Sequence, residues 1–106
     1  MRPFFHNILY VYIMYEISPR TYKIAKDLGL TVFPSGNKKY KIEVYDKDGL
    51  FMYYGGDARY NDYHIYLRDF GKSYAKERQR LYMIRHRPEI ESVGSRGWVI
   101  YKLLWF

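Results

Sequence analysis

Residues 39–54 read KYKIEVYDKDGLFMYY, and this stretch decides the fold. Tyr40, Ile42 and Val44 alternate with more polar positions, which is typical of a strand with one buried face. The tetrapeptide at residues 46–49, DKDG, has the composition of a tight turn, and an apolar run follows it. Two such strands joined by a tight turn predict an antiparallel β-hairpin.

A second strand signal lies upstream, in residues 7–17, with the sequence NILYVYIMYEI. β-branched and aromatic residues favour a strand, and Pro19 is expected to end it because proline lacks the backbone donor. A membrane span needs about 20 apolar residues. Glu16 interrupts this shorter run, which also lacks the small-residue cleavage site of a signal peptide. We therefore predict a third strand here, and neither a transmembrane segment nor a signal peptide.

Two helices are predicted to cover the sheet. Residues 73–87 begin with Ser73, a favourable N-cap, and end before Pro88, which pushes the preceding residue out of helical geometry. Residues 98–106, WVIYKLLWF, fit a helical face better than strict alternation. Residues 21–30 are ambiguous, with apolar positions that also suit one helical face.

The remaining segments complete the predicted fold. Residues 57–69 are polar and aromatic and are predicted to be irregular, whereas residues 88–91 either follow the main helix as a loop or form a short second turn. The prediction is a single α+β domain over residues 1–106. It has a small antiparallel sheet, made of the N-terminal strand and the hairpin, covered by one main helix and a short C-terminal helix.

The composition favours a protein that attaches to a larger object. The chain has no cysteine, which excludes disulfides and thiolate metal sites. Its formal net charge of +7 favours nucleic acid, an anionic membrane or an acidic protein as partner. Aromatic residues make up 21% of the chain, with 14 tyrosines, and tyrosine is enriched at interfaces.

The sequence contains no pattern that predicts catalysis. The three histidines, His6, His64 and His86, have no metal-ligand spacing, so we expect no metal and no cofactor. Asp46 and Asp48 are explained by the turn of the hairpin, where aspartate is common. We therefore expect a protein that is not an enzyme.

The most basic stretch is residues 76–89, KERQRLYMIRHRPE, which contains four arginines. At about 100° per residue, Arg78 and Arg85 share one arc of the predicted helix with Tyr74 and Leu81, whereas Arg80 and Arg87 lie on the opposite side. The second pair is explained by a solvated face. The first pair lies on an apolar face and needs a partner.

An arginine on an apolar face extends its charged end to solvent, pairs with a carboxylate or meets an anion from outside the chain. We expect at least one of Arg78 and Arg85 to be largely buried and bonded to Asp62, to Asp69 or to carbonyls of the 57–69 segment. A bound phosphate or a carboxylate of a partner is the alternative. The candidate residues for partner or anion contact are Arg78, Arg80, Arg85, Arg87, Tyr82 and His86. The candidate structural residues are Asp62, Tyr63, Asp69, Trp98 and Trp105.

Several short motifs follow one another in a characteristic order: a Lys-Tyr strand, an aromatic-Gly pair, an Asp-Tyr pair, an Arg-x-x-x-Tyr-x-x-Arg-His run, a Gly-aromatic pair and a terminal Leu-Leu-Trp. The residues concerned are Lys39, Tyr40, Tyr54, Gly55, Asp62, Tyr63, Arg78, Tyr82, Arg85, His86, Gly97, Leu103, Leu104 and Trp105. Over residues 38–105, this order resembles a family of small uncharacterised proteins encoded by nucleocytoplasmic large double-stranded DNA viruses.

The resemblance implies a viral protein located in the virion, and in the host cytoplasm during assembly. Together with the tyrosine excess, it leads to the hypothesis of a non-enzymatic structural protein, a minor capsid or cement component whose partners are other capsid proteins. The alternative is a small basic viral DNA- or RNA-binding protein, because of the +7 charge and the arginine-rich helix.

Overall fold

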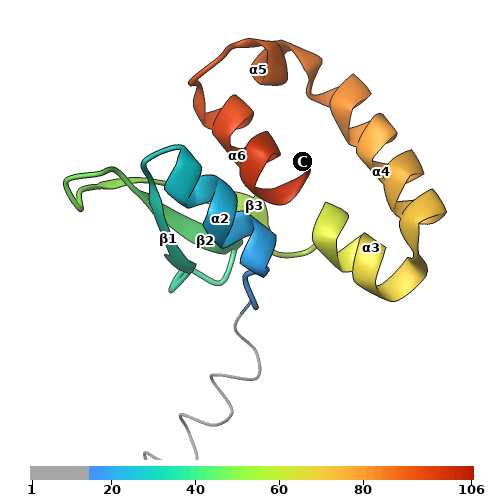
Figure 1. The fold of residues 1–106 in the computed structure, drawn as a ribbon, viewed down its shortest axis with the longest axis horizontal. Coiled ribbons are helices and arrows are strands. Elements are labelled where there is room, and N and C mark those ends of the chain that lie inside the picture. Colours follow the sequence, from blue (N-terminus) through green and yellow to red (C-terminus); the bar gives the residue numbers. More distant parts are fainter. Residues whose placement is uncertain (1–14) are drawn as a thin grey trace, which may run out of the picture.

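The computed structural model describes residues 15–106 (Figure 1). The three strands are β1 (Thr31–Pro34), β2 (Tyr40–Tyr45) and β3 (Phe51–Asp57). The helices are α2 (Pro19–Asp27), α3 (Tyr63–Phe70), α4 (Lys72–Arg85), α5 (Arg87–Glu91) and α6 (Arg96–Leu104). The predicted α+β class is therefore confirmed.

The strands form one antiparallel sheet in the order β1-β2-β3, and its hairpin is the one that residues 39–54 predict. The carboxylate of Asp46 accepts hydrogen bonds from the backbone N–H groups of Asp48 and Leu50 at 2.9 and 3.0 Å, which fixes the turn. Gly49 has a φ of 82°, a left-handed conformation that glycine adopts without strain. The second strand is longer than predicted and continues to Asp57.

The third strand of the described sheet is β1, which pairs with β2 through Val32 and Val44. The strand predicted at residues 7–17 lies mostly outside the described residues, and residues 15–17 belong to no strand. The ambiguous segment 21–30 contributes most of α2, whose first turn is capped by the Ser18 side chain.

One face of the sheet carries the hydrophobic core. Ile42 and Val44 are fully buried against Leu103 and Leu104 of α6. Gly55 lets α6 approach β3, because a Cβ atom at this position would collide with Ile100. α6 covers the sheet as predicted, but α2 takes the place of the 73–87 helix beside it (Figure 1).

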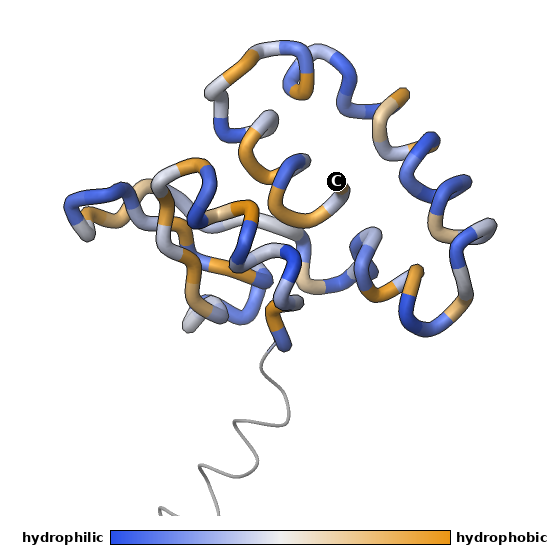
Figure 2. The backbone as a smooth tube through the Cα atoms, viewed as in Figure 1, coloured by the Kyte–Doolittle hydropathy of each residue, from blue (hydrophilic) through white to orange (hydrophobic). Residues whose placement is uncertain are grey.

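The longest helix packs elsewhere. α4 contacts α3 and α5, and Figure 1 shows the α3–α4 hairpin on the far side of α6 from the sheet. Figure 2 shows α4 as largely hydrophilic and α6 as largely hydrophobic, which agrees with their positions. α6 contains five buried residues, whereas α4 buries only Ala75.

Several predicted boundaries were wrong, among them that of the C-terminal helix, which spans Arg96–Leu104 rather than residues 98–106. Residues 57–69 are not irregular throughout, because Asp62 caps α3 by accepting a hydrogen bond from the N–H of Ile65 at 3.0 Å. Ser73 is not an N-cap, since α4 begins at Lys72 after Gly71. The helix ends at Arg85 rather than residue 87, and the short second turn forms as α5.

The β3 edge of the described sheet is partly occupied. The Arg96 guanidinium donates two hydrogen bonds to the Tyr54 carbonyl, at 3.0 and 2.8 Å. The other edge strand, β1, has four residues and ends in Pro34.

Candidate functional site

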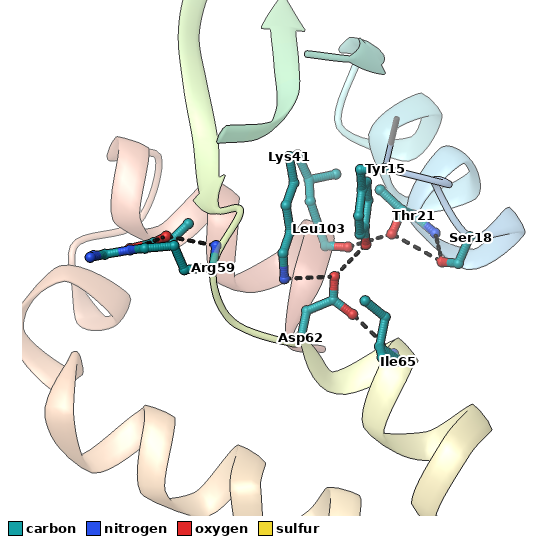
Figure 3. A network of polar contacts seen from close by, with 9 residues as sticks. Tyr15, Ser18, Thr21, Lys41, Arg59, Asp62, Ile65 and Leu103 are labelled. Carbon is teal, nitrogen blue, oxygen red and sulfur yellow. Dashed lines mark hydrogen bonds and ion pairs between the residues drawn. The ribbon is translucent and has the colours of Figure 1, made fainter. Parts of the chain in front are cut away.

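A buried polar network joins the sheet to the start of α3 (Figure 3). The Nζ atom of Lys41 lies 3.4 Å from Oδ2 of Asp62, and their side chains are 5% and 0% exposed. The Tyr15 hydroxyl donates a hydrogen bond to the same carboxylate. Figure 3 shows these three side chains converging from β2, from the segment before α2 and from the N-terminus of α3.

The electrostatics of this network fit a structural role. Burial lowers the pKa of Lys41, although the Asp62 carboxylate opposes that shift. Burial also raises the pKa of the Tyr15 hydroxyl well above its ordinary value, and the charge of Asp62 adds to the effect. The ion pair between Lys41 and Asp62 holds the start of α3 against β2. Both side chains are closed to solvent, so they are not positioned to meet a ligand.

The side of α4 that carries Arg78 and Arg85 does not face the core, contrary to the prediction. Arg85 is exposed, and Arg78 is half-buried with its guanidinium 5.3 Å from the centre of the Tyr66 ring. Asp62 pairs with Lys41, and Asp69 pairs with Arg68 at 2.7 Å, so neither carboxylate serves Arg78 or Arg85. The prediction of a buried, carboxylate-bonded arginine is therefore wrong.

The physical reason is the orientation of α4. The arc that contains Tyr74, Leu81 and both arginines turns outward, and Tyr74 and Leu81 are themselves exposed. The side that packs is centred on Ala75 and Tyr82, roughly a quarter of a turn away.

Three other candidate contact residues lie toward the C-terminal end of α4 or beyond it. Arg80 pairs with Glu77 on the exposed side of the helix, at 2.7 Å. Arg87 is exposed at the start of α5. His86 lies against the Tyr82 ring, with the ring centres 4.3 Å apart, and its Nδ1 is 3.8 Å from Glu89.

Tyr82 holds α4 to the end of the chain. Its ring stacks on Trp105 with 4.2 Å between ring centres, and the Gln79 side chain donates a hydrogen bond to the Trp105 carbonyl at 2.6 Å. Burial raises the pKa of Tyr82 to about 12. Two candidate structural residues lie nearer the core: Tyr63 is buried at the start of α3, and Trp98 packs against the core cluster from α6.

The sheet face opposite α6 presents a continuous row of aromatic rings, which we call the sheet row. Its residues are Phe33, Tyr40, Tyr45, Phe51 and Tyr54. Consecutive ring centres lie 4.9–5.7 Å apart, from Phe33 to Tyr45, then Phe51, Tyr54 and Tyr40. Phe33 and Phe51 are 52% and 48% exposed.

A second exposed aromatic group lies on the α3–α4 hairpin, and we call it the helix patch. It consists of Tyr66, Phe70, Tyr74, Arg78 and Arg85. The three rings lie within 5.0–6.1 Å of one another, and Phe70 and Tyr74 are 57% and 46% exposed. Arg78 extends the group along α4, and Arg85 follows two turns later.

The two surfaces differ in charge. Residues 31–59, which contain the sheet row, carry five Lys and Arg against four Asp and Glu. Residues 63–85, which contain the helix patch, carry six against two, a surplus of four positive charges. The sheet region is therefore nearly neutral, whereas the helical hairpin is strongly basic.

The sheet row was not predicted, although the sequence contains a signal for it. Alternation places Glu43 and Tyr45 on the face opposite Ile42 and Val44, and the pairing of β2 with β3 adds Phe51 and Tyr54. The clustering itself depends on the register of three strands, which the sequence alone does not provide.

The described residues give no metal cluster or membrane helix. In residues 15–106, no group of three or more His, Asp or Glu side chains is arranged to hold a metal ion. No helix of that part of the chain is long and apolar enough to cross a membrane. His6 lies outside the described residues.

Comparison with protein-family models, with curated proteins and with solved structures found no match to this chain. Its function is therefore inferred from the surfaces described above.

Proposed function

We propose that the protein is a non-enzymatic structural protein of a virus particle, a minor capsid or cement component that attaches to another capsid protein through the sheet row. The viral setting rests on the order of motifs over residues 38–105. The observation that carries the attachment site is the continuous row of five rings, with Phe33 and Phe51 exposed and the three tyrosines half-buried, on a nearly neutral sheet.

The chemistry of the row favours a protein partner over a polyanion. Aromatic side chains offer large contact areas at low conformational cost, and they dominate the centres of protein interfaces. Glu43 lies among the rings, where it accepts hydrogen bonds from the Tyr45 hydroxyl at 2.7 Å and the Gly36 N–H at 2.8 Å. The Gly36 bond, followed by that of Tyr45, lowers the pKa of Glu43. A fixed negative charge within the row repels phosphate but accepts donors of a protein.

A groove between α2 and β1 adjoins the row. Phe33 and Lys47 belong to its lining, together with Tyr22 and Leu30. A side chain of the partner that enters this groove would extend the contact beyond the flat sheet face.

Purified particles test this function. We expect the wild-type protein to co-purify with the particle, and the variant Phe33→Ser/Phe51→Ser to be reduced about tenfold or more, as for the loss of interface hot spots. Val93→Ser, which removes an exposed apolar residue remote from the row in sequence, is the control and should be incorporated normally. A wild-type protein missing from the particle, or a double variant incorporated normally, contradicts the proposal.

A further inference from the structure

We propose that the helix patch binds single-stranded nucleic acid, with bases stacked on Phe70 and Tyr74 and phosphates held by Arg78 and Arg85. This surface is distinct from the sheet row, and the ligand belongs to a different class from the protein partner proposed above.

The rings of the helix patch are arranged for stacking. Phe70 and Tyr74 come from α3 and α4, across the turn at Gly71, and their ring centres are 5.0 Å apart with 30° between the ring planes. About half of each side chain is exposed. Tyr66 packs beside both rings, with its ring centre 6.1 Å from that of Phe70 and 5.6 Å from that of Tyr74. Exposed rings of this kind stack on bases with little sequence preference, because every base has a π-face.

The cations of the hairpin are available to an external anion. Its two carboxylates are already paired, Asp69 with Arg68 and Glu77 with Arg80. These ion pairs lower the pKa of both carboxyl groups. The cations of the hairpin that have no carboxylate partner within residues 15–106 are Lys72, Lys76, Arg78 and Arg85.

Rings and cations share one side of α4. Tyr74, Arg78 and Arg85 follow one another at spacings of four and seven residues, which places them on a common stripe. The stripe covers about 16 Å along the helix axis. A strand of several nucleotides spans this length, whereas a single nucleotide does not. Arg78 lies over Tyr66, so its guanidinium is held beside the rings.

The presence of both rings and cations in the helix patch favours one class of polyanion over the others. An acidic protein would satisfy the cations without using the rings. Duplex DNA would use the phosphate contacts, but its bases are stacked on one another and offer no free faces. Only a single strand uses both the stacked rings and the positive charges.

Fluorescence anisotropy with labelled oligothymidine tests the proposal, with the matching duplex and polyglutamate as competitors. We expect binding that weakens as salt rises. Phe70→Ala/Tyr74→Ala and Arg78→Gln/Arg85→Gln should each weaken binding about tenfold or more. The glutamine pair should also flatten the slope of log affinity against log salt by about 1.4, the value for two phosphate contacts to a single strand.

Two controls separate this site from the rest of the molecule. Arg80→Gln removes a cation from the opposite side of α4 and should leave affinity nearly unchanged. Phe33→Ser/Phe51→Ser removes rings of the sheet row and should bind oligothymidine like the wild type while failing to enter particles. The two proposals can therefore fail separately.

Circular dichroism establishes that each variant is folded, and glutamine keeps the aliphatic stem that packs beside Tyr66. If the glutamine pair does not fold, Arg78→Lys/Arg85→Lys retains the charge and should keep most of the affinity, while Phe70→Ala/Tyr74→Ala remains the decisive variant. The proposal is overturned if the wild type does not bind oligothymidine at low salt, or if either pair binds like the wild type. It is also overturned if duplex or polyglutamate competes equally well.

Discussion

Lys41 and Asp62 are 21 positions apart in the sequence, yet they meet as an ion pair inside the protein, with the ammonium nitrogen 3.4 Å from the carboxylate. The pair links the middle of the sheet to the first turn of α3. The same carboxylate accepts the Tyr15 hydroxyl and the N–H of Ile65, so one side chain fixes three segments.

Removal of one partner of this pair should be strongly destabilising. Lys41→Met leaves the Asp62 carboxylate buried without its counter-charge, and we expect a loss of about 3–5 kcal/mol in the free energy of unfolding. Urea denaturation measures it. Lys41→Met/Asp62→Asn, which removes both charges and keeps a capping side chain, should recover much of the loss. A single variant as stable as the wild type would show that the pair is not structurally important.

Thr21 should contribute through one hydrogen bond. Its hydroxyl is fully buried and donates to the Leu103 carbonyl at 2.6 Å, in the last turn of α6 where carbonyls lack helical partners. Thr21→Val keeps the shape but leaves that carbonyl without this donor, at a cost of about 1–3 kcal/mol. Thr31→Val, at an exposed position of β1, is the control in the same denaturation experiment. Equal losses in both variants would argue against the hydrogen bond as the cause.

Gly55 should not tolerate a side chain. A methyl group there collides with the Ile100 side chain, chiefly with its Cδ1 atom, so Gly55→Ala should lower the free energy of unfolding by about 1–3 kcal/mol. Ile100→Val removes Cδ1, and the double variant should therefore be more stable than the sum of the two single changes predicts. Gly36→Ala, where the nearest atom is 3.4 Å away, is the comparison in thermal melts. If the stability losses of Gly55→Ala and Ile100→Val simply add in the double variant, the clash with Cδ1 is not the cause of the loss at Gly55.

The stability should fall in alkaline solution, partly because of Tyr82. Its pKa is about 12 in the folded protein and about 10 when unfolded. The stabilisation linked to its proton is complete below pH 10 and is lost as the pH rises through 12, because the unfolded chain ionises first. Two pKa units correspond to about 2–3 kcal/mol. Denaturation at a series of pH values should show a smaller alkaline loss for Tyr82→Phe than for the wild type, and an equal loss in both would contradict the assignment to Tyr82.

The arginines of the helix patch should matter little for stability. Arg78→Gln removes one cation–π contact, worth about 0.5–1 kcal/mol, and Arg85→Gln at an exposed position should change stability by about 0.5 kcal/mol or less. Arg80→Gln should melt like the wild type. Thermal melts of all three variants check this. A large fall in melting temperature for Arg78→Gln would support a structural role for the Arg78 side chain.

The hairpin could be predicted because its signals are local. Alternation and the 46–49 turn lie within 16 consecutive residues. The turn and the alternation of residues 42–45 are present in the structure, whereas Lys41 is buried and Tyr40, predicted to face the core, stacks on Tyr54 in the sheet row. β1 could not be predicted in the same way, because four residues ending in Pro34 carry little strand signal until Val32 meets Val44 across the sheet. α3 did have a local signal, since Asp62 is a good N-cap, but the polar and aromatic residues around it suggested a loop.

The helix patch shows the limit of a helical wheel. The wheel grouped Tyr74, Arg78 and Arg85 on one side of α4, and they do share that side. It could not show which side faces the core, because that side is set by distant contacts, such as those of Tyr82 with Tyr101 and Trp105. Lys41 is a similar case: alternation gives it a solvent-facing position, and only the distant Asp62 explains its burial.

The hydrogen bonds from Arg96 to the Tyr54 carbonyl have a consequence for how copies of this chain can combine. A sheet grows when an incoming strand finds a free row of backbone donors and acceptors along an edge. One margin of this sheet has an acceptor already occupied, and the other is short and ends in a proline. Within the described sheet, an incoming strand therefore finds a reduced template at both margins, and the addition of strands from one copy to the next into a fibre is disfavoured.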